Sequence, residues 1–366
     1  MKKIIKKIIV IVSVVFVLLC GFVFGLNMNH NEKTTKEVMQ LEEYGYEKYS
    51  AGDYNLGVYR IGNKDSKYKL IALSGMGIND YNIGMSAVNR LLKEDYEIIY
   101  IDRAGYGYSD DTDVTQTTEQ IVNDYRTSLK NTGIEGSYIL LPHSLGGVYA
   151  TYWANAYPDE IEGIVFIDCS IVEENARDWE EYKTTFLDRV TYTLCQIGAQ
   201  RLVLREFSYP VPKYCTEEHQ QVADYLNIYS ATTKAKLSES DQIVNNFNFT
   251  YEHIKSDSVP KVFVNATSGY RTEKEVFNGI EWLRNRQKEV GIEPSSTEIT
   301  SEIAQKVIDD ATKHTNDVIM PYLEKMGNTE LVNLGGNHSI YEERPEELAE
   351  VIREFVENID NYKGDF

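Results

Sequence analysis

The sequence has few cysteines and no cluster of metal-binding side chains. Four of its 366 residues are cysteine, and no Cys-x-x-Cys pair or Cys/His group has the spacing of a zinc site. We therefore expect no bound metal and no cofactor. Cys195 and Cys215 would be able to form a disulfide in an oxidising compartment, but their spacing leaves this pairing open.

Positive charge is also scarce. The chain carries 37 Lys and Arg against 57 Asp and Glu, a net charge of −20, and four of the lysines lie within the first seven residues. Such an acidic body is not expected to bind nucleic acid or, through its folded part, an anionic membrane surface. Long low-complexity tracts are absent and aromatic residues are plentiful, which is typical of a globular protein. The oligomeric state is left open.

A long apolar run near the N-terminus predicts a membrane anchor. The segment IIVIVSVVFVLLCGFVFGL (8–26) is uncharged and close to the length of about 20 residues that crosses a bilayer. Lysines precede it, which favours a cytoplasmic N-terminus, and no A-x-A cleavage pattern follows. We predict a basic cytoplasmic tail (1–7), a single span of the cell membrane (8–26) and a polar stalk (27–50) that carries an extracellular catalytic domain. Cleavage of the apolar segment is the open alternative.

Apolar runs alternate with helical patterns through the remainder of the chain. Continuous apolar strands alternating with helices predict an α/β fold with a mostly parallel sheet covered on both faces. The segment from about 172 to 258 breaks this alternation; it has helical spacing and is rich in Tyr and Phe. We interpret it as a cap inserted within a domain spanning 51–366. The runs predicted as strands are 54–62, 68–77, 96–110, 137–141, 161–170, 259–269 and 329–336.

Ser144 lies in LLPHSLGG, between a predicted strand and a predicted helix. A strand, a sharp turn with serine and a helix hold a hydroxyl exposed at the end of a sheet. A serine nucleophile needs a base within hydrogen-bond reach, an acid that orients the base and donors for the oxyanion. His338, in a Gly-rich loop after the last predicted strand, is the best candidate for the base.

Several motifs in this order resemble those of the α/β-hydrolase fold superfamily, and the resemblance covers about 54–358. It implies an eight-stranded type of sheet with the cap inserted after the sixth strand. It also implies that Ser144 is the nucleophile and His338 the base. A serine at this position argues against haloalkane dehalogenase and epoxide hydrolase chemistry, which use an aspartate. The motifs are LSGMG as an oxyanion loop, DRAGYGYSD as the turn after the fourth strand, PHSLGG as the nucleophile elbow and GGNHSIYEERPEEL as the histidine loop.

Two positions depart from the family pattern. Pro142 replaces the first glycine of the elbow, and Ser74 replaces the usual histidine of the oxyanion loop. The resemblance still implies that the backbone N–H groups of Met76 and Leu145 form the oxyanion hole. In the DRAGYGYSD motif, Asp102 and Arg103 are interpreted as residues that shape the turn.

The acid is the least constrained member of the site. Most relatives carry it after the seventh strand, where this chain has no Asp and only Glu273 and Glu275. Some relatives carry it after the sixth strand, where Asp168 lies. We predict Asp168 as the acid, with Glu273 or Glu275 as alternatives.

The resulting expectation is a membrane-anchored serine hydrolase that cleaves a small acyl substrate, a carboxylic ester or thioester, through an acyl-enzyme. An aminopeptidase or a C–C bond hydrolase on the same fold is the alternative enzyme. A catalytically inactive binding module is the alternative from another class.

Overall fold

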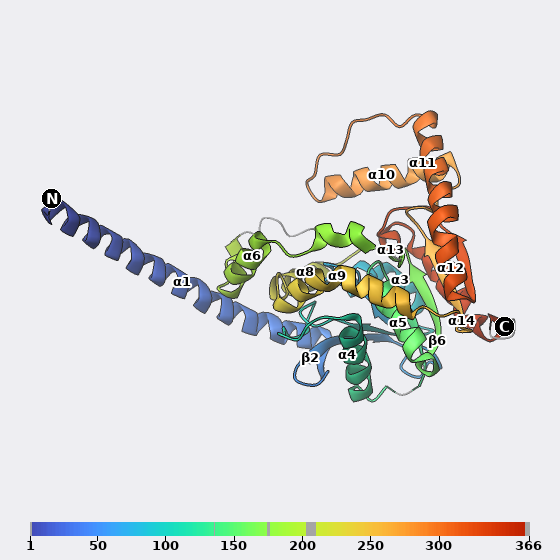
Figure 1. Cartoon of the computed structure of the whole chain (residues 1–366), viewed down its shortest axis with the longest axis horizontal. Helices are drawn as coiled ribbons and strands as arrows, with labels where there is room; N and C mark the ends of the chain where they lie inside the picture. Colours follow the sequence, from blue (N-terminus) through green and yellow to red (C-terminus); the bar gives the residue numbers. More distant parts are fainter. Residues whose placement is uncertain (1, 135, 174–175, 203–209, 363–366) are drawn as a thin grey trace.

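Eight strands form the central sheet of the computed structural model, which describes residues 2–134, 136–173, 176–202 and 210–362 (Figure 1). Small parts of the predicted tail, cap and domain therefore lie outside the described residues. The strand order is β1-β2-β4-β3-β5-β6-β7-β8. The strands are β1 (Tyr46–Ser50), β2 (Asn55–Gly62), β3 (Lys69–Leu73), β4 (Glu97–Ile101), β5 (Tyr138–Pro142), β6 (Ile161–Ile167), β7 (Lys261–Asn265) and β8 (Thr329–Asn333).

The sheet is parallel from β4 to β8, and β1 and β2 join it as antiparallel strands. Its central strands are buried on both faces because they are continuous apolar runs. The register aligns their carboxyl ends: Leu73 pairs with Pro142, and Ile167 pairs with Val264. The loops that follow β3, β5, β6 and β7 therefore meet at one edge of the sheet. The predicted fold class is confirmed.

Helices cover both faces, and successive strand residues point into two separate cores. Ile71 and Leu73 belong to one core, whereas Leu70 and Ala72 belong to the other. The first core is closed by α4 (Thr118–Asn131), α5 (Gly146–Ala156) and α12 (Met320–Met326). The second is closed by α2 (Tyr81–Gly84), α3 (Ser86–Leu92), α13 (Ile340–Glu343), α14 (Pro345–Glu357) and α15 (Ile359–Tyr362).

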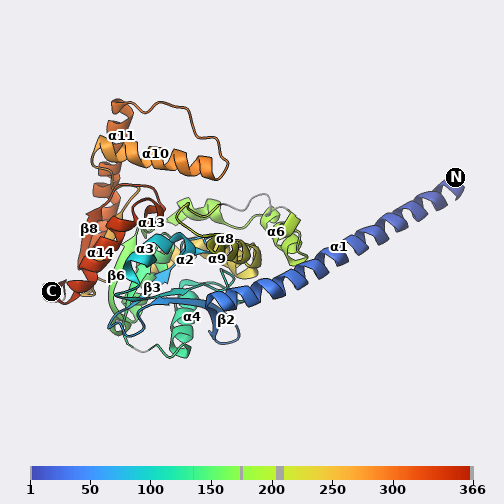
Figure 2. The same cartoon turned by 180° about the vertical axis from the view of Figure 1, so that it is seen from behind.

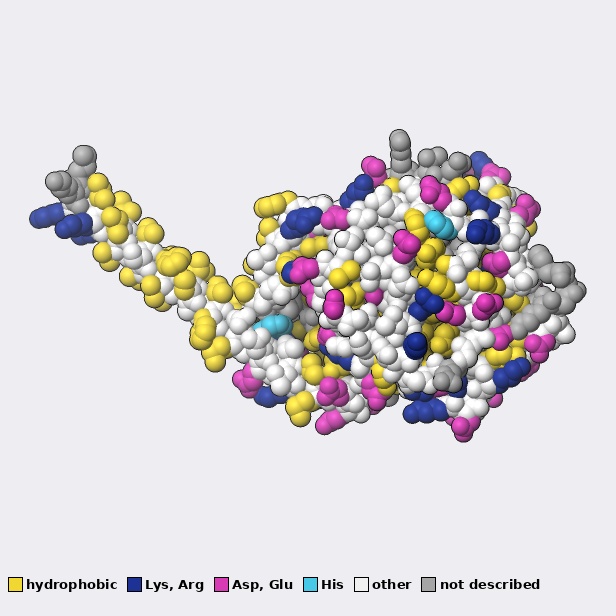
Figure 3. Space-filling view, turned by 60° about the horizontal axis from the view of Figure 1, so that its bottom comes forward, with side chains coloured by type: hydrophobic (Ala, Val, Ile, Leu, Met, Phe, Trp, Pro, Cys, Tyr) yellow, Lys and Arg dark blue, Asp and Glu magenta, His cyan; other side chains and the backbone are white. Residues whose placement is uncertain are grey.

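The N-terminal helix α1 (Lys2–Tyr44) extends away from the body (Figures 1 and 2). Among the described residues it is the one helix long and apolar enough to cross a membrane, by length and composition, and its apolar stretch is unburied. Hydrophobic side chains line the part of α1 that lies outside the body (Figure 3). The segment predicted as a stalk (27–50) instead continues α1 and then forms β1. Leu41 and Tyr46 are buried with residues of α8 (Glu217–Tyr229), so the folded body begins before residue 51.

The insertion between β6 and β7 is helical, as the predicted fold class requires. A short turn, η1 (Pro158–Glu160), precedes β6. The insertion that follows β6 contains η2 (Ala176–Tyr182), α6 (Phe186–Gln196), α8 and α9 (Lys234–His253). Helix α9 packs on α5 through the first core. The disulfide between Cys195 and Cys215, left open by the sequence, is not formed: all four cysteines lie in the described chain as free thiols.

Helices α10 (Glu273–Glu289) and α11 (Ser301–His314), which lie between β7 and β8 in the chain, project from the body (Figures 1 and 2). The sequence pattern predicted a long helix from about residue 301, and the structure has α11 (Ser301–His314) continued by η3 (Thr315–Ile319) and α12. The preceding helix, α10 (Glu273–Glu289), was not predicted. Its N-terminus carries a capping box in which Thr272 and Glu275 satisfy each other's backbone N–H groups. The sequence TEKE contained this signal.

Candidate active site

Ser144 stands on a sharp turn between β5 and α5. Its φ of 52° lies in the left-handed region, which a non-glycine residue occupies when the surrounding structure holds it there. Two backbone N–H groups donate to Ser144 O, from Gly147 at 3.0 Å and from Ser170 at 3.1 Å. The turn therefore presents a serine in a strained conformation at the carboxyl edge of the sheet.

Two glycines let neighbouring segments approach this turn closely. A Cβ on Gly75 would lie 2.8 Å from Ser144 Cβ, and one on Gly146 would lie 2.6 Å from Leu73 O. Side chains are thus excluded at both positions. Gly75 allows the loop after β3 to lie directly against Ser144, and Gly146 allows α5 to begin against the end of β3.

The backbone N–H groups of Met76 and Leu145 lie in segments adjacent to Ser144. Met76 follows Gly75, and Leu145 is the N-cap residue of α5, where N–H groups have no acceptor within the helix. Within the described chain, neither N–H donates to another protein group. Both remain available to an oxygen atom of a ligand.

Asp168 and His338 come together from the ends of β6 and β8. Asp168 Oδ2 accepts a hydrogen bond from His338 Nδ1 at 2.7 Å; the carboxylate is 6% exposed and the imidazole 51%. The other oxygen, Oδ1, accepts from the backbone N–H groups of Ala266 at 2.8 Å and Thr267 at 3.0 Å. Asp168 also has a positive φ of 43°. The carboxylate is therefore held in one orientation, and the imidazole that it contacts faces solvent.

The alternative acids lie elsewhere. Glu275 accepts hydrogen bonds from the N–H groups of Arg271 and Thr272 at the start of α10, and Glu273 belongs to the same first turn. Asp102 accepts from Tyr108 N–H at 2.9 Å and so shapes its turn, as predicted. No group of three or more metal-binding side chains occurs in the part of the chain that the structure describes.

His143 connects His338 with the serine turn. The two imidazole rings lie 4.5 Å apart, and His143 Nε2 bonds to the backbone oxygen of His338 at 3.0 Å. Across the described residues, no hydrogen bond joins Ser144 Oγ to His338. Catalytic hydrogen bonds are often long in structures without substrate and tighten in the complex. His143 thus holds the histidine loop beside the turn in which Ser144 directly follows His143.

Burial, with the nearby His338, lowers the pKa of His143 to about 3. An unfolded histidine binds a proton as the pH falls through about 6.5, whereas folded His143 stays neutral, so the folded state loses stability below that pH. The free energy of unfolding is expected to fall by about 2 kcal/mol from about pH 7 to about pH 5 through this residue. His143→Gln keeps a donor for His338 O but does not titrate. Urea unfolding at both pH values should show a smaller fall for this variant; an equal fall would contradict the assignment.

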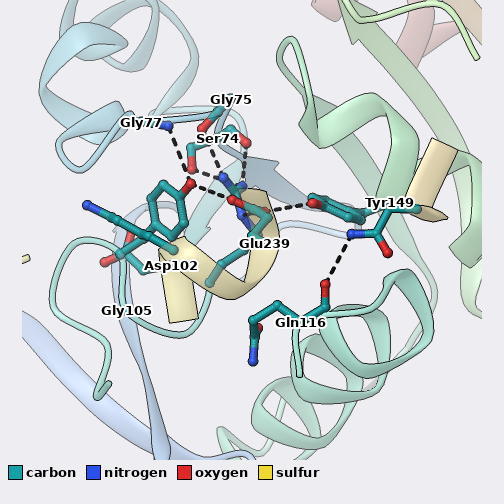
Figure 4. A network of polar contacts seen from close by, with 12 residues as sticks. Ser74, Gly75, Gly77, Asp102, Gly105, Gln116, Tyr149 and Glu239 are labelled. Atoms are coloured by element: carbon teal, nitrogen blue, oxygen red, sulfur yellow. Dashed lines mark hydrogen bonds and ion pairs between the residues drawn. The ribbon is translucent and has the colours of Figure 1, made fainter. Parts of the chain in front are cut away.

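A buried polar network joins the loop after β3 to the cap (Figure 4). Arg103 donates to Ser74 O at 2.6 Å and to Gly75 O at 3.0 Å, and its Nε lies 2.7 Å from Glu239 Oε1. Both charged side chains are 1% exposed, and Glu239 belongs to α9. Tyr149 donates to Glu239 Oε1 at 2.6 Å, and Tyr106 donates to Oε2. Arg103 therefore does more than shape a turn: it also pairs with the cap, a contact that the sequence pattern did not predict.

The comparisons with known proteins agree with the α/β fold described above. Residues 65–267, more than half of the chain, match the family model described as serine aminopeptidase, S33. The chain is 24% identical over 363 residues to the uncharacterized protein YbdG of Bacillus subtilis, covering 95% of this chain and 98% of that protein. It is 34% identical over 104 residues to a pimeloyl-[acyl-carrier protein] methyl ester esterase of Shewanella woodyi, covering 28% of this chain and 36% of that protein.

Among solved structures, the chain is similar to Cfl2 of Burkholderia cenocepacia. The TM-score is 0.58 at 16% identity, covering 85% of this chain and 95% of that chain. At this identity the likeness concerns the fold. With the family match over more than half of its length, the chain belongs to the serine aminopeptidase S33 family of hydrolases, within the α/β-hydrolase fold superfamily.

Proposed function

We propose that the protein is a serine hydrolase that cleaves a carboxylic ester or thioester through an acyl-enzyme intermediate. The observation that carries this proposal is the strained Ser144 turn beside the 2.7 Å hydrogen bond between Asp168 and His338. The local similarity to an esterase supports an ester substrate.

In the proposed reaction, Ser144 Oγ attacks the carbonyl carbon and His338 Nε2 takes the hydroxyl proton. His338 can do so because its Nδ1–H is held by Asp168, which leaves Nε2 as the free base. The N–H groups of Met76 and Leu145 bind the oxyanion. His338 then protonates the leaving alcohol or thiol, and in the second half-reaction it activates the water that releases the acid.

An aminopeptidase is the second candidate, favoured by the description of the matching family. Such an enzyme needs a carboxylate that is free to bind the α-ammonium group of its substrate. The buried cap carboxylate of Glu239 is already occupied by Arg103 and two tyrosines. Glu239 is therefore not available for this role.

A fluorophosphonate probe tests the proposal on the full-length protein in detergent. We expect one adduct, mapped by mass spectrometry to Ser144. Ser144→Ala should not react, whereas Ser170→Ala, which changes the serine that donates its N–H to Ser144 O, should react normally. Esters and thioesters of varied acyl length would then be compared with aminoacyl amides. A folded protein that forms no adduct would contradict the proposal.

We also propose that residues 8–26 of α1 cross the cell membrane once. The tail (1–7) would then be cytoplasmic and the catalytic domain extracellular. The length and composition of α1, its unburied apolar stretch and the lysines before this stretch support this arrangement.

A further inference from the structure

The cap exposes large apolar side chains on and just after helix α6. Phe186 is 83% exposed, Leu187 69%, Leu202 56% and Leu194 47%. Among the described residues, no other large apolar side chain is as exposed as Phe186. Leu187 and Leu194 are seven residues apart and so share one face of the helix. We call these four side chains the cap apolar surface.

Helix α6 is held against α1 at the end of the apolar segment (Figures 1 and 2). Asn27 Nδ2 donates to Gln196 O at 3.4 Å, and a Cβ on Gly198 would lie 2.4 Å from His30 Cβ. The largely buried side chain of Arg201 forms a 2.6 Å ion pair with Glu37. These contacts fix the height of α6 along α1.

That height coincides with the expected boundary of a bilayer. The apolar run of α1 ends at Leu26, and His30 follows four residues later, about 6 Å further along the helix axis. The polar interfacial layer on each side of the hydrocarbon core is about 5–8 Å thick. If Leu26 marks the edge of the hydrocarbon core, then the contacts of Gln196 with Asn27 and of Gly198 with His30 lie within the headgroup layer.

We propose that the cap apolar surface lies in the headgroup layer of the membrane that α1 crosses, so that the cap rests on the lipid. This inference depends on the proposed anchoring by α1. The occupant is a bilayer because the exposed apolar side chains adjoin a helix suited to span one. The charges nearby are mixed, with Arg189 beside Asp188 on α6, and the whole chain carries −20. The contact is therefore apolar and requires no anionic lipid.

Tryptophan quenching in phosphatidylcholine nanodiscs tests this surface with the full-length protein. Leu187→Trp and Leu194→Trp report on the cap. Ile292→Trp is the control, because it lies in the loop between α10 and α11, which project from the body. Ile292 matches Leu194 in exposure, at 46% against 47%. Subtracting the emission spectrum of the unsubstituted protein removes the contribution of its three native tryptophans. The tryptophans at 187 and 194 should show blue-shifted emission, and lipids brominated near the headgroup should quench their fluorescence. The fluorescence of the tryptophan at 292 should be neither shifted nor quenched.

A fourth variant separates this inference from the anchoring on which it depends. Phe16→Trp places the reporter within the apolar segment of α1, where the native side chain is 64% exposed. Quenching at 16 by lipids brominated near the ends of the acyl chains, together with quenching at 187 and 194 by lipids brominated near the headgroup, supports both proposals. Quenching at 16 with water-like emission at 187 and 194 overturns the cap surface alone. Water-like emission at 16 overturns both.

Discussion

Replacing Asp168 with asparagine is expected to lower kcat for p-nitrophenyl esters by about 10⁴-fold. Asp168 Oδ1 accepts two backbone N–H groups, so the amide oxygen of asparagine would occupy that place and its NH₂ group would face His338. An NH₂ donor forces His338 Nδ1 to become an acceptor and moves the ring proton to Nε2. The imidazole is then protonated on the atom that must take the proton from Ser144.

The measurement is steady-state hydrolysis by the purified full-length protein, with thermal unfolding to verify that each variant is folded. Glu273→Gln and Glu275→Gln are the controls, because these carboxylates lie at the start of α10. Both should keep the wild-type kcat. If Asp168→Asn retained activity while Glu273→Gln lost it, the assignment of the acid would be wrong.

The sequence predicted the sheet and the turn of Ser144 because both leave local patterns. Continuous apolar runs marked the strands, and the run that leads into Ser144 followed by a helical pattern marked the turn. Asp168 was nominated because some relatives carry the acid after the sixth strand, and Glu273 and Glu275 remained as alternatives. Its contact with His338, 170 residues away, depends on parallel strands that align their carboxyl ends.

Other features could not be predicted from local patterns. The polar segment after residue 26 gave no sign that it packs on α8, because the few apolar residues involved, such as Leu41, find their partners only in the folded chain. The ion pair between Arg103 and Glu239 joins a turn to a cap helix 136 residues away, and no periodicity reports a buried charge pair. Such a pair becomes visible only when the cap is placed over the sheet.

The ion pair leads to the second expected result. Arg103 fixes the carbonyl groups of Ser74 and Gly75, which immediately precede the Met76 N–H, so the cap carboxylate orients the proposed oxyanion donor through Arg103. Glu239→Gln keeps the size and one acceptor but removes the charge. We expect kcat for p-nitrophenyl esters to fall by about 10²-fold with little change in KM, because a misplaced donor acts mainly on the transition state.

The control lies on the same helix. Asp241 pairs with Arg189 at 3.0 Å on the surface, where both side chains are substantially exposed, so Asp241→Asn should leave kcat unchanged. A buried pair that loses one partner also destabilises a protein, by about 3–5 kcal/mol when the remaining charge is left unpaired. Stability and positioning are separated by measuring kcat well below the unfolding temperature and normalising it to the fraction of protein that fluorophosphonate labels. A lower unfolding temperature with an unchanged normalised kcat would make the pair purely structural. A lower normalised kcat at unchanged KM would make Glu239 a positioning residue, which acts through Arg103 on the proposed oxyanion donor Met76.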